Sequence, residues 1–128
     1  MNVVAGVFTD GDMVLACRRR DDRSFAGCWE FPGGKQEPDE AAEEALEREI
    51  AEELGVETEV GELLNRSTTM VGGMPITLAC YFVRAVGSAP LVSTDHDLVS
   101  WFPRRGLIWL PWAAPDLPAV RDLAFAVG

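Results

Sequence analysis

The chain has 128 residues, enough for one compact domain, and its 48% hydrophobic content excludes an intrinsically disordered protein. Its formal net charge of −10 leaves no basic surface for phosphates, which excludes a binder of duplex nucleic acid. No apolar run approaches the roughly 20 residues that cross a bilayer, and we expect no secretory signal and no membrane association. Cys17, Cys28 and Cys80 have unrelated spacings and predict buried, free thiols in a cytoplasmic protein.

The first part of the chain predicts three strands. Residues 3–9 and 13–18 are rich in strand-forming residues and flank Asp-Gly-Asp, so they predict a β-hairpin. After a polar connection, residues 29–31 predict a short strand that Pro-Gly-Gly at 32–34 ends. This segment therefore supplies strands and a tight glycine-containing stop.

A helix is predicted from Pro38 and Asp39 to Leu54, with Gly55 as the residue after its C-terminus. Its apolar residues recur every four positions, as in a helix with one buried face. They are Ala42, Leu46, Ile50 and Leu54.

The second half of the chain predicts three more strands and one helix. Residues 57–70 and 75–86 flank a Val-Gly-Gly turn, and residues 97–102 form another strand. An irregular stretch rich in tryptophan follows from Pro103, and residues 117–127 have helical spacing. Strands interleaved with two helices predict an α/β (α+β) sandwich in one domain over residues 1–128. We expect the tryptophans to pack in the core.

Three carboxylates crowd one edge of the first predicted helix. Glu49, Glu52 and Glu53 fall within an arc of roughly 100°, and Arg48 lies one turn before Glu52. Like charges one turn apart destabilise an empty helix slightly, whereas Mg²⁺ prefers oxygen ligands and binds carboxylates together with substrate phosphates. This edge is either a solvated acidic face or a site for a divalent cation.

The spacing of these residues resembles the Nudix box. That pattern is a Gly, five residues, Glu, seven residues, then Arg-Glu-apolar-x-Glu-Glu-x-Gly-apolar. The sequence Trp-Glu-Phe-Pro-Gly-Gly-Lys at 29–35 also resembles the segment before the box in MutT-like pyrophosphohydrolases. The positions that match the box are Gly34, Glu40, Arg48, Glu49, Ile50, Glu52, Glu53, Gly55 and Val56.

The resemblance implies a Nudix-type α/β/α sandwich with a central mixed β-sheet, and a hydrolase that uses Mg²⁺ or Mn²⁺. Glu52 and Glu53 would be the main metal ligands, and Arg48 would orient the carboxylates. Glu49 would be a ligand or the base for the attacking water, and the resemblance leaves open whether Glu49 or Glu53 is the base. The Gly33 carbonyl would add a further metal bond.

Residues outside the helix also receive expected roles from the resemblance. Asp95, six positions before Trp101, would supply another carboxylate to the metal, while its neighbour His96 is expected to have no special role. Arg18 and Lys35 would contact phosphate oxygens. The other arginines of that segment, Arg19, Arg20 and Arg23, are expected to be solvated, and Glu40 is expected to join loop and helix.

The expected base contacts are Asp116 and the backbone near Ala5. MutT proper carries Asn at the position of Asp116, whereas the CTP pyrophosphohydrolase branch carries Asp, which resembles this chain. A carboxylate accepts hydrogen bonds and suits the N4 amino group of cytosine. Asp116 also stands where the N-cap of the last helix is expected.

These observations predict a cytoplasmic, Mg²⁺-dependent enzyme that converts (d)CTP, or a modified cytosine nucleotide, to the monophosphate and pyrophosphate. The first alternative is hydrolysis of 8-oxo-(d)GTP. The second is a catalytically silent Nudix module that only binds a nucleotide. The expected partner is a small nucleoside triphosphate, and the expected state is a monomer, with a weak homodimer as the alternative.

Overall fold

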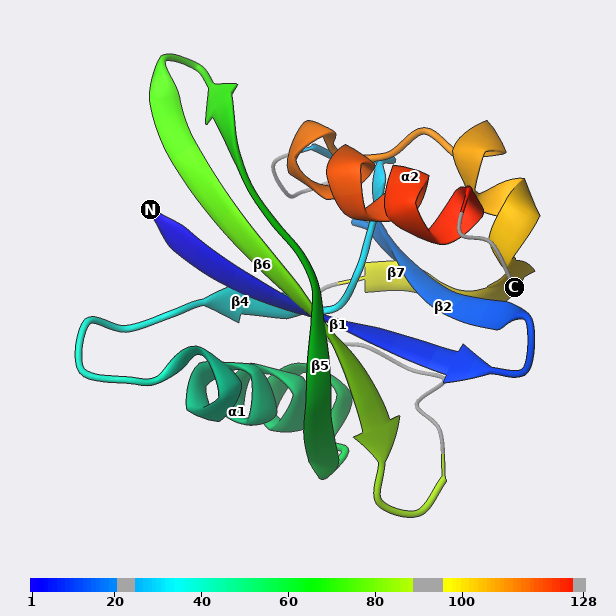
Figure 1. The fold of residues 1–128 in the computed structure, drawn as a ribbon, viewed down its shortest axis with the longest axis horizontal. Coiled ribbons are helices and arrows are strands. Elements are labelled where there is room, and N and C mark those ends of the chain that lie inside the picture. The colour runs from blue at the N-terminus through cyan, green and yellow to red at the C-terminus, as the bar shows by residue number, and fades with distance from the viewer. Residues whose placement is uncertain (21–24, 89–95, 126–128) are drawn as a thin grey trace.

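Within residues 1–20, 25–88 and 96–125, which the computed structural model describes, seven strands and two α-helices form three layers (Figure 1). The elements in chain order are β1 (Asn2–Asp10), β2 (Met13–Arg19), β3 (Trp29–Glu30), β4 (Gly33–Lys35), α1 (Ala42–Leu54), β5 (Thr58–Val71), β6 (Met74–Ala85), β7 (His96–Pro103), the 3₁₀-helices η1 (Arg104–Trp109) and η2 (Ala114–Asp116), and α2 (Leu117–Ala124).

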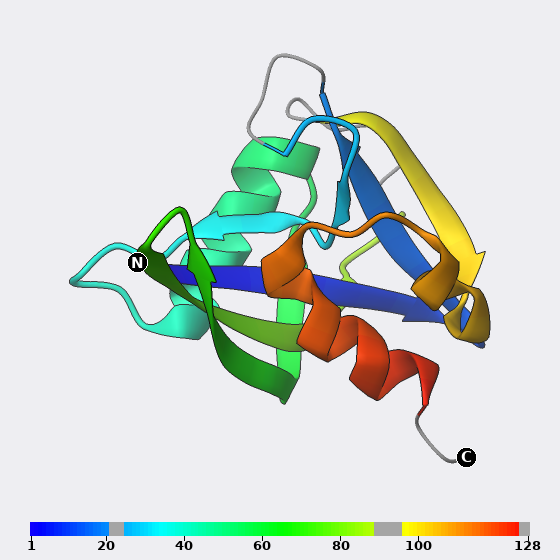
Figure 2. The ribbon, with the colours of Figure 1, turned by 90° about the horizontal axis from the view of Figure 1, so that it is seen from above.

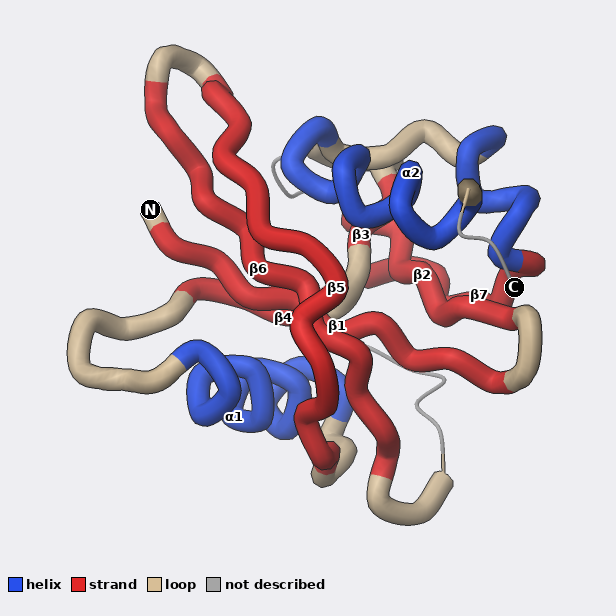
Figure 3. The backbone as a smooth tube through the Cα atoms, viewed as in Figure 1, coloured by secondary structure: helices blue, strands red, loops and turns tan. Residues whose placement is uncertain are grey.

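The strands form a mixed β-sheet with β1 in its middle (Figure 3). The order is β3-β2-β1-β6-β5, and β4 also pairs with β1 while β7 pairs with β2. β1 and β6 run parallel from Asn2 opposite Thr77 to Phe8 opposite Val83, and the other pairs are antiparallel. The predicted hairpins β1–β2 and β5–β6 are both present.

The two faces of β1 are covered by different helices. Successive side chains of a strand point to opposite faces, so Val4 and Phe8 join the cluster of α1, whereas Ala5 and Val7 join that of α2. Figures 1 and 2 show α1 and α2 on opposite sides of the sheet. The α/β/α sandwich with a mixed sheet that the sequence predicts is confirmed.

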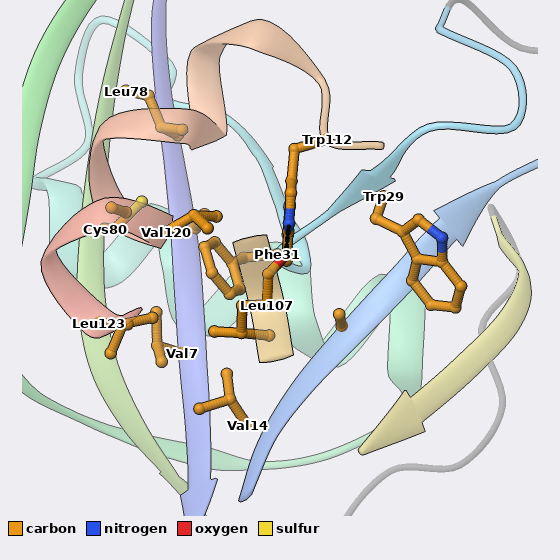
Figure 4. Close-up of a cluster of buried hydrophobic side chains, with 13 residues drawn as sticks. Val7, Val14, Trp29, Phe31, Leu78, Cys80, Leu107, Trp112, Val120 and Leu123 are labelled. Atoms are coloured by element: carbon orange, nitrogen blue, oxygen red, sulfur yellow. Dashed lines mark hydrogen bonds between the residues drawn. The ribbon is translucent and has the colours of Figure 1, made fainter. Parts of the chain in front are cut away.

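The core on the α2 side combines aliphatic and aromatic side chains (Figure 4). Val120 and Leu123 of α2 are buried against the sheet together with Phe31 and Trp112. The rings of Phe31 and Trp112 lie 4.8 Å apart between centroids, and the indole N–H of Trp112 donates to the carbonyl of Leu107 at 2.6 Å. This cluster anchors the segment before α2, which forms one wall of the pocket described below.

Helix α1 packs through the apolar stripe that its sequence predicts. Leu46 and Ile50 are fully buried, and burial of such a side chain stabilises a fold by about 1.5–3 kcal/mol. At Gly6 a side chain would stand 2.9 Å from the Ile50 Cδ1 atom, so this glycine lets α1 approach β1 closely. The helix ends at Gly55, whose φ of 67° is the left-handed conformation expected after a helix C-terminus.

The segment at 32–34 differs from the prediction of a plain stop. Gly33–Lys35 forms β4, which pairs antiparallel with Val3–Ala5 of β1. A Cβ atom at Gly33 would overlap the carbonyl oxygen of Val4, so only glycine allows this pairing. Glycine has low strand propensity, and the sequence pattern therefore hides the strand.

Helix α1 begins at Ala42, four residues later than predicted. The Glu40 carboxylate accepts the Glu37 N–H at 3.0 Å, and the Gln36 side-chain amide donates to the Glu40 carbonyl at 2.9 Å. These bonds hold residues 36–40 as a loop. The helix then starts after Ala41, whose N–H donates to Glu44 at 3.1 Å.

The tryptophans do not share one environment. Trp29 and Trp112 are buried, as predicted, and Trp101 is half-buried. The expected burial of Trp109 is wrong, because its side chain is 82% exposed at the end of η1, where Leu107 faces the core instead. In the part of the chain that the structure describes, neither α-helix has the length and hydrophobicity needed to span a bilayer.

Candidate active site

Arg48 connects the carboxylate edge of α1 to the loop that precedes this helix. Its guanidinium donates two hydrogen bonds to Glu40, at 2.7 and 2.8 Å, and one to Glu49 at 3.0 Å. It also donates to Glu52 at 3.3 Å and to the Lys35 carbonyl at 3.1 Å. The fork of an arginine suits such bidentate pairing, so Arg48 fixes both the loop and the orientation of two carboxylates.

Glu40 belongs to this loop and not to the edge that carries the other carboxylates. The hydrogen bond from Arg48, followed by that from the Glu37 N–H, lowers the pKa of Glu40 to about 2. Glu40 therefore stays ionised at neutral pH and holds Arg48 in place. This is the loop-to-helix role that the sequence analysis expects for Glu40.

Glu49 lies directly against β4. A Cβ atom added at Gly34 would overlap the carboxylate of Glu49, so the missing side chain of Gly34 makes the space that this carboxylate occupies. The preceding residue of β4, Gly33, is opposite Ala5 of β1. The box glycine and the box glutamate are thus complementary in shape across two elements.

The buried Glu53 carboxylate lies beside the buried ring of His96. Its Oε1 lies 2.7 Å from Nδ1 of His96, whose Nε2 lies 2.7 Å from Oε2 of Glu30. Glu30 also accepts a hydrogen bond from Arg19 at 2.9 Å. Burial alone would lower the pKa of His96, but its hydrogen bonds to Glu30 and Glu53 outweigh burial and raise that pKa to about 9. Because carboxylates only accept hydrogen bonds, both ring nitrogens donate.

The residues of this edge fit a hard divalent cation in their chemistry. Glu49 and Glu52 present carboxylate oxygens toward Arg48, and the side chain of Glu52 is 61% exposed. Among the described residues, no three acidic, histidine or cysteine side chains already form a metal-binding group. A bound cation would therefore have to draw Glu49 and Glu52 away from Arg48. Their carboxylate oxygens are donors of the type that such a cation prefers.

A pocket of about 310 Å³ lies between β1, β4 and the segment before α2. Its volume is at the lower end of that of small-molecule sites. Ala5, Gly33 and Asp116, which the sequence analysis connects with base and metal, all line it, as do Arg19 and Glu30. The pocket wall therefore contains the expected base contacts together with Arg19 and Glu30. These two residues connect through His96 to Glu53 of α1.

The Asp116 carboxyl group is held in this pocket by the backbone of Phe31. Its Oδ2 accepts the Phe31 N–H at 3.0 Å, and the side chain forms no capping hydrogen bond to α2. Asp116 is thus at the N-cap position of α2, as expected, but its carboxyl group accepts from Phe31, directly after β3, and does not cap the helix. Burial and the neighbouring charge of Glu30 raise the pKa of Asp116, so this group gains from a further hydrogen-bond donor in the pocket.

The two expected phosphate contacts lie outside this pocket. Arg18 forms a bidentate pair with Asp97 at 2.9 and 3.1 Å. Lys35 is exposed and lines a separate hollow beside Gln36. Asp95, the expected loop ligand, falls outside the residues that the structure describes.

Sequence reasoning missed three residues of the site, namely Arg19, Glu30 and His96. Arg19 was expected to be solvated, but it lines the pocket and pairs with Glu30. His96 was expected to have no special role, but it is buried between two carboxylates. The signals available were weak, namely the glutamate after Trp29 and the only histidine of the chain.

Comparison with known proteins agrees with this geometry. The NUDIX domain family matches residues 1–123. A CTP pyrophosphohydrolase of Escherichia coli K12 is 35% identical over 121 residues, which cover 94% of this chain and 89% of that protein. The putative 8-oxo-dGTP diphosphatase 2 of Mycobacterium tuberculosis H37Rv is 36% identical over 125 residues, which cover 95% and 86%.

Solved structures show the same architecture. The solution structure of the E. coli ORF135 protein matches with a TM-score of 0.83 and 34% identity, over 94% of this chain and 86% of that one. The crystal structure of a MutT NUDIX hydrolase from Burkholderia pseudomallei matches with a TM-score of 0.81 and 28% identity, over 94% and 95%.

The sandwich, the box helix and these matches define a hydrolase that acts on phosphoanhydride bonds of nucleotides. The chain belongs to the Nudix family, with MutT-like relatives over nearly its whole length. The resemblance identified from the sequence is confirmed.

Proposed function

We propose that the protein is a Mg²⁺-dependent pyrophosphohydrolase that converts a cytosine nucleoside triphosphate, CTP or dCTP, to the monophosphate and pyrophosphate. One observation carries the proposal. Gly34 borders both the carboxylate of Glu49 and the pocket that contains Asp116. A base bound against Asp116 can therefore extend its phosphates toward the carboxylate edge of α1.

The base preference follows from the hydrogen bond between Phe31 and Asp116. Because the Phe31 N–H occupies Oδ2, Oδ1 is the oxygen left for a base. An oxygen at this point accepts a hydrogen bond from the N4 amino group of cytosine. An asparagine would have to turn its oxygen to Phe31 and its NH₂ to the pocket, where it would repel N4 and suit the O6 acceptor of a purine.

The residues of α1 would hold the metal through the oxygens of Glu49, Glu52 and Glu53, together with the Gly33 carbonyl and Asp95. A bound Mg²⁺ neutralises triphosphate charge and lowers the pKa of a bound water. Glu49 lies nearest to β4 and Arg48 orients it, which favours Glu49 over the buried Glu53 as the base that accepts the proton of water. Mn²⁺ can replace Mg²⁺ in this role.

The phosphate contacts of the proposal use Arg18 and Lys35, with Arg19 as an addition from the structure. Arg19 lines the pocket, whereas Arg18 has to leave Asp97 before it can reach a phosphate. We further infer a monomer, since the reaction as proposed needs no second subunit. The inferred location is the cytoplasm.

A second candidate is hydrolysis of 8-oxo-dGTP. The similarity to the putative 8-oxo-dGTP diphosphatase 2 of M. tuberculosis favours it, at an identity close to that of the CTP pyrophosphohydrolase. The pocket is lined mainly by backbone and apolar side chains such as Leu78, and these surfaces accept either kind of base.

The test is a panel of CTP, dCTP, 5-methyl-dCTP and 8-oxo-dGTP with Mg²⁺, in which products are identified by ³¹P NMR and kcat/KM is compared. We expect the cytosine nucleotides to be hydrolysed fastest and to give the monophosphate and pyrophosphate, with no turnover in EDTA. A higher kcat/KM for 8-oxo-dGTP would establish the second candidate. Lack of turnover with every triphosphate would establish a silent binding module.

A further inference from the structure

A chain of four charged side chains, two of them buried and two partly buried, joins the pocket to the box helix. Arg19 of β2 contacts Glu30 of β3, Glu30 contacts His96 of β7, and His96 contacts Glu53 of α1. The side chain of His96 is 1% exposed and that of Glu53 4% exposed. Buried charges are retained when each has a partner of opposite sign, and this chain alternates in sign along its length.

The register of β7 explains why His96 points inward. β2 pairs Arg18 with Leu98 and Arg19 with His96, so a bulge lies between the two pairs. A bulge changes the direction of the side chains next to it. His96 consequently enters the core, while Asp97 faces solvent and pairs with Arg18.

The two nitrogens of the imidazole have different tasks in this arrangement. Nδ1 faces Glu53 of the box, whereas Nε2 faces Glu30 in the wall of the pocket. Arg19 donates to the same oxygen, Oε2 of Glu30, and so holds the group to which the ring is anchored through Nε2. The bond through Nδ1 then determines where one oxygen of Glu53 lies.

We propose that His96 is a positioning residue that holds the Glu53 carboxylate in the orientation required for the divalent cation. The inference rests on the proposed function in one respect, that Glu53 is a metal ligand. Partners behind a metal ligand orient it, and their replacement typically changes metal affinity or activity by about 10- to 100-fold.

Two substitutions separate the nitrogens. In His96→Asn the side-chain amide replaces Nδ1, because both atoms are bonded to Cγ, and a donor to Glu53 is kept. In His96→Gln the longer side chain places its amide near the Nε2 position, and the donor toward Glu30 is kept. Both variants lose the ring and keep one amide, so each is the control for loss of the imidazole in the other. Leu98→Ala, at an exposed position of the same strand, is the control for disturbance of β7.

The measurement is Mn²⁺ binding without nucleotide, followed by electron paramagnetic resonance, together with kcat and KM for the best triphosphate. We expect His96→Gln to weaken Mn²⁺ binding by about 10-fold and to lower kcat by about 10- to 100-fold, with KM changed less than about threefold. His96→Asn should stay within about threefold of wild type, and Leu98→Ala should not differ from it.

Several outcomes would overturn the inference. They are equal Mn²⁺ affinity in the two His96 variants, a weaker affinity in His96→Asn than in His96→Gln, and absence of Mn²⁺ binding by the wild-type protein. If either variant does not fold, Glu53→Gln is measured alone, and unchanged Mn²⁺ affinity there contradicts the inference as well. Failure of the substrate panel with normal Mn²⁺ results would reject the proposed function and leave the role of His96 standing.

Discussion

The carboxylate of Glu49 occupies the space where Gly34 has no side chain. These residues lie on α1 and β4, and Arg48 fixes the same carboxylate from its other side at 3.0 Å. The glycine of the box is thus required by contact with the Glu49 side chain, since nothing in its backbone conformation demands a glycine.

We expect Gly34→Ala to lower kcat by roughly 100-fold, because a displacement of about 1 Å at a reacting group has an effect of that size. The atom displaced is the flexible end of Glu49, so the free energy of unfolding should change by less than about 1 kcal/mol. Steady-state kinetics and urea unfolding measure the two effects. Wild-type turnover in this variant would show that the position of Glu49 is unimportant.

The neighbouring substitution Gly33→Ala should behave in the opposite way. Its Cβ atom would overlap the backbone of Val4 and Ala5, which cannot move aside without disturbing the pairing of β1 and β4. We expect a loss of about 1–3 kcal/mol in the free energy of unfolding. Urea unfolding at neutral pH measures it, and a stability equal to that of Gly34→Ala would contradict the close approach seen here.

Asp116→Asn should change the choice of base. Because the Phe31 N–H donates to the side chain at this position, the amide oxygen has to face Phe31 and the NH₂ group faces the pocket. We expect the ratio of kcat/KM for dCTP to that for 8-oxo-dGTP to fall by about 10- to 100-fold, as for a change of one specific base contact of about 1–3 kcal/mol. An unchanged ratio, with Asp116→Ala as the comparison, would remove Asp116 from the set of base contacts.

Glu40→Gln should alter the acid stability of the fold. The pKa of Glu40 is about 2 in the folded protein and 4.5 ordinarily, so its contribution is complete above pH 4.5 and is lost as the pH falls through 2. We expect the difference in unfolding free energy between wild type and Glu40→Gln to be constant above pH 5 and to shrink below it. Urea unfolding of both proteins between about pH 2 and pH 7 checks this, and a constant difference at all pH values would contradict the pairing with Arg48.

Leu46→Ala should destabilise the layer under α1. Leu46 is fully buried in the cluster that joins this helix to β1. Its truncation should reduce the free energy of unfolding by about 2–5 kcal/mol. Met70→Ala, at a side chain that is 63% exposed, serves as the control and should change it by less than about 0.5 kcal/mol. Equal effects in the two variants would mean that Leu46 is not a core residue.

The sequence by itself determined the features that depend on local spacing. Apolar residues that recur every four positions predict the buried face of α1, and the i,i+4 relation places Arg48 beside Glu52. The spacing of the box also predicts the family. The first two features follow from helix geometry, which is the same wherever the helix lies in a fold, whereas the family follows from the resemblance of the motif.

Only the tertiary structure decided which charged groups of different elements are partners. A bulge of one residue in the pairing of β2 and β7 sends His96 inward to Glu53 and leaves Asp97 to Arg18. No sequence period contains the position of that bulge, because it arises from the register of strands far apart in the chain.

Strand β4 is a wall shared by the carboxylate edge of α1 and the pocket. Gly34 of β4 lies against Glu49 of α1, and Gly33 and Gly34 both line the pocket, which other elements largely form. Spacing along the chain can place carboxylates on a helix, but their neighbours across the sheet depend on close backbone approach. That approach is possible here because two adjacent residues carry no side chain.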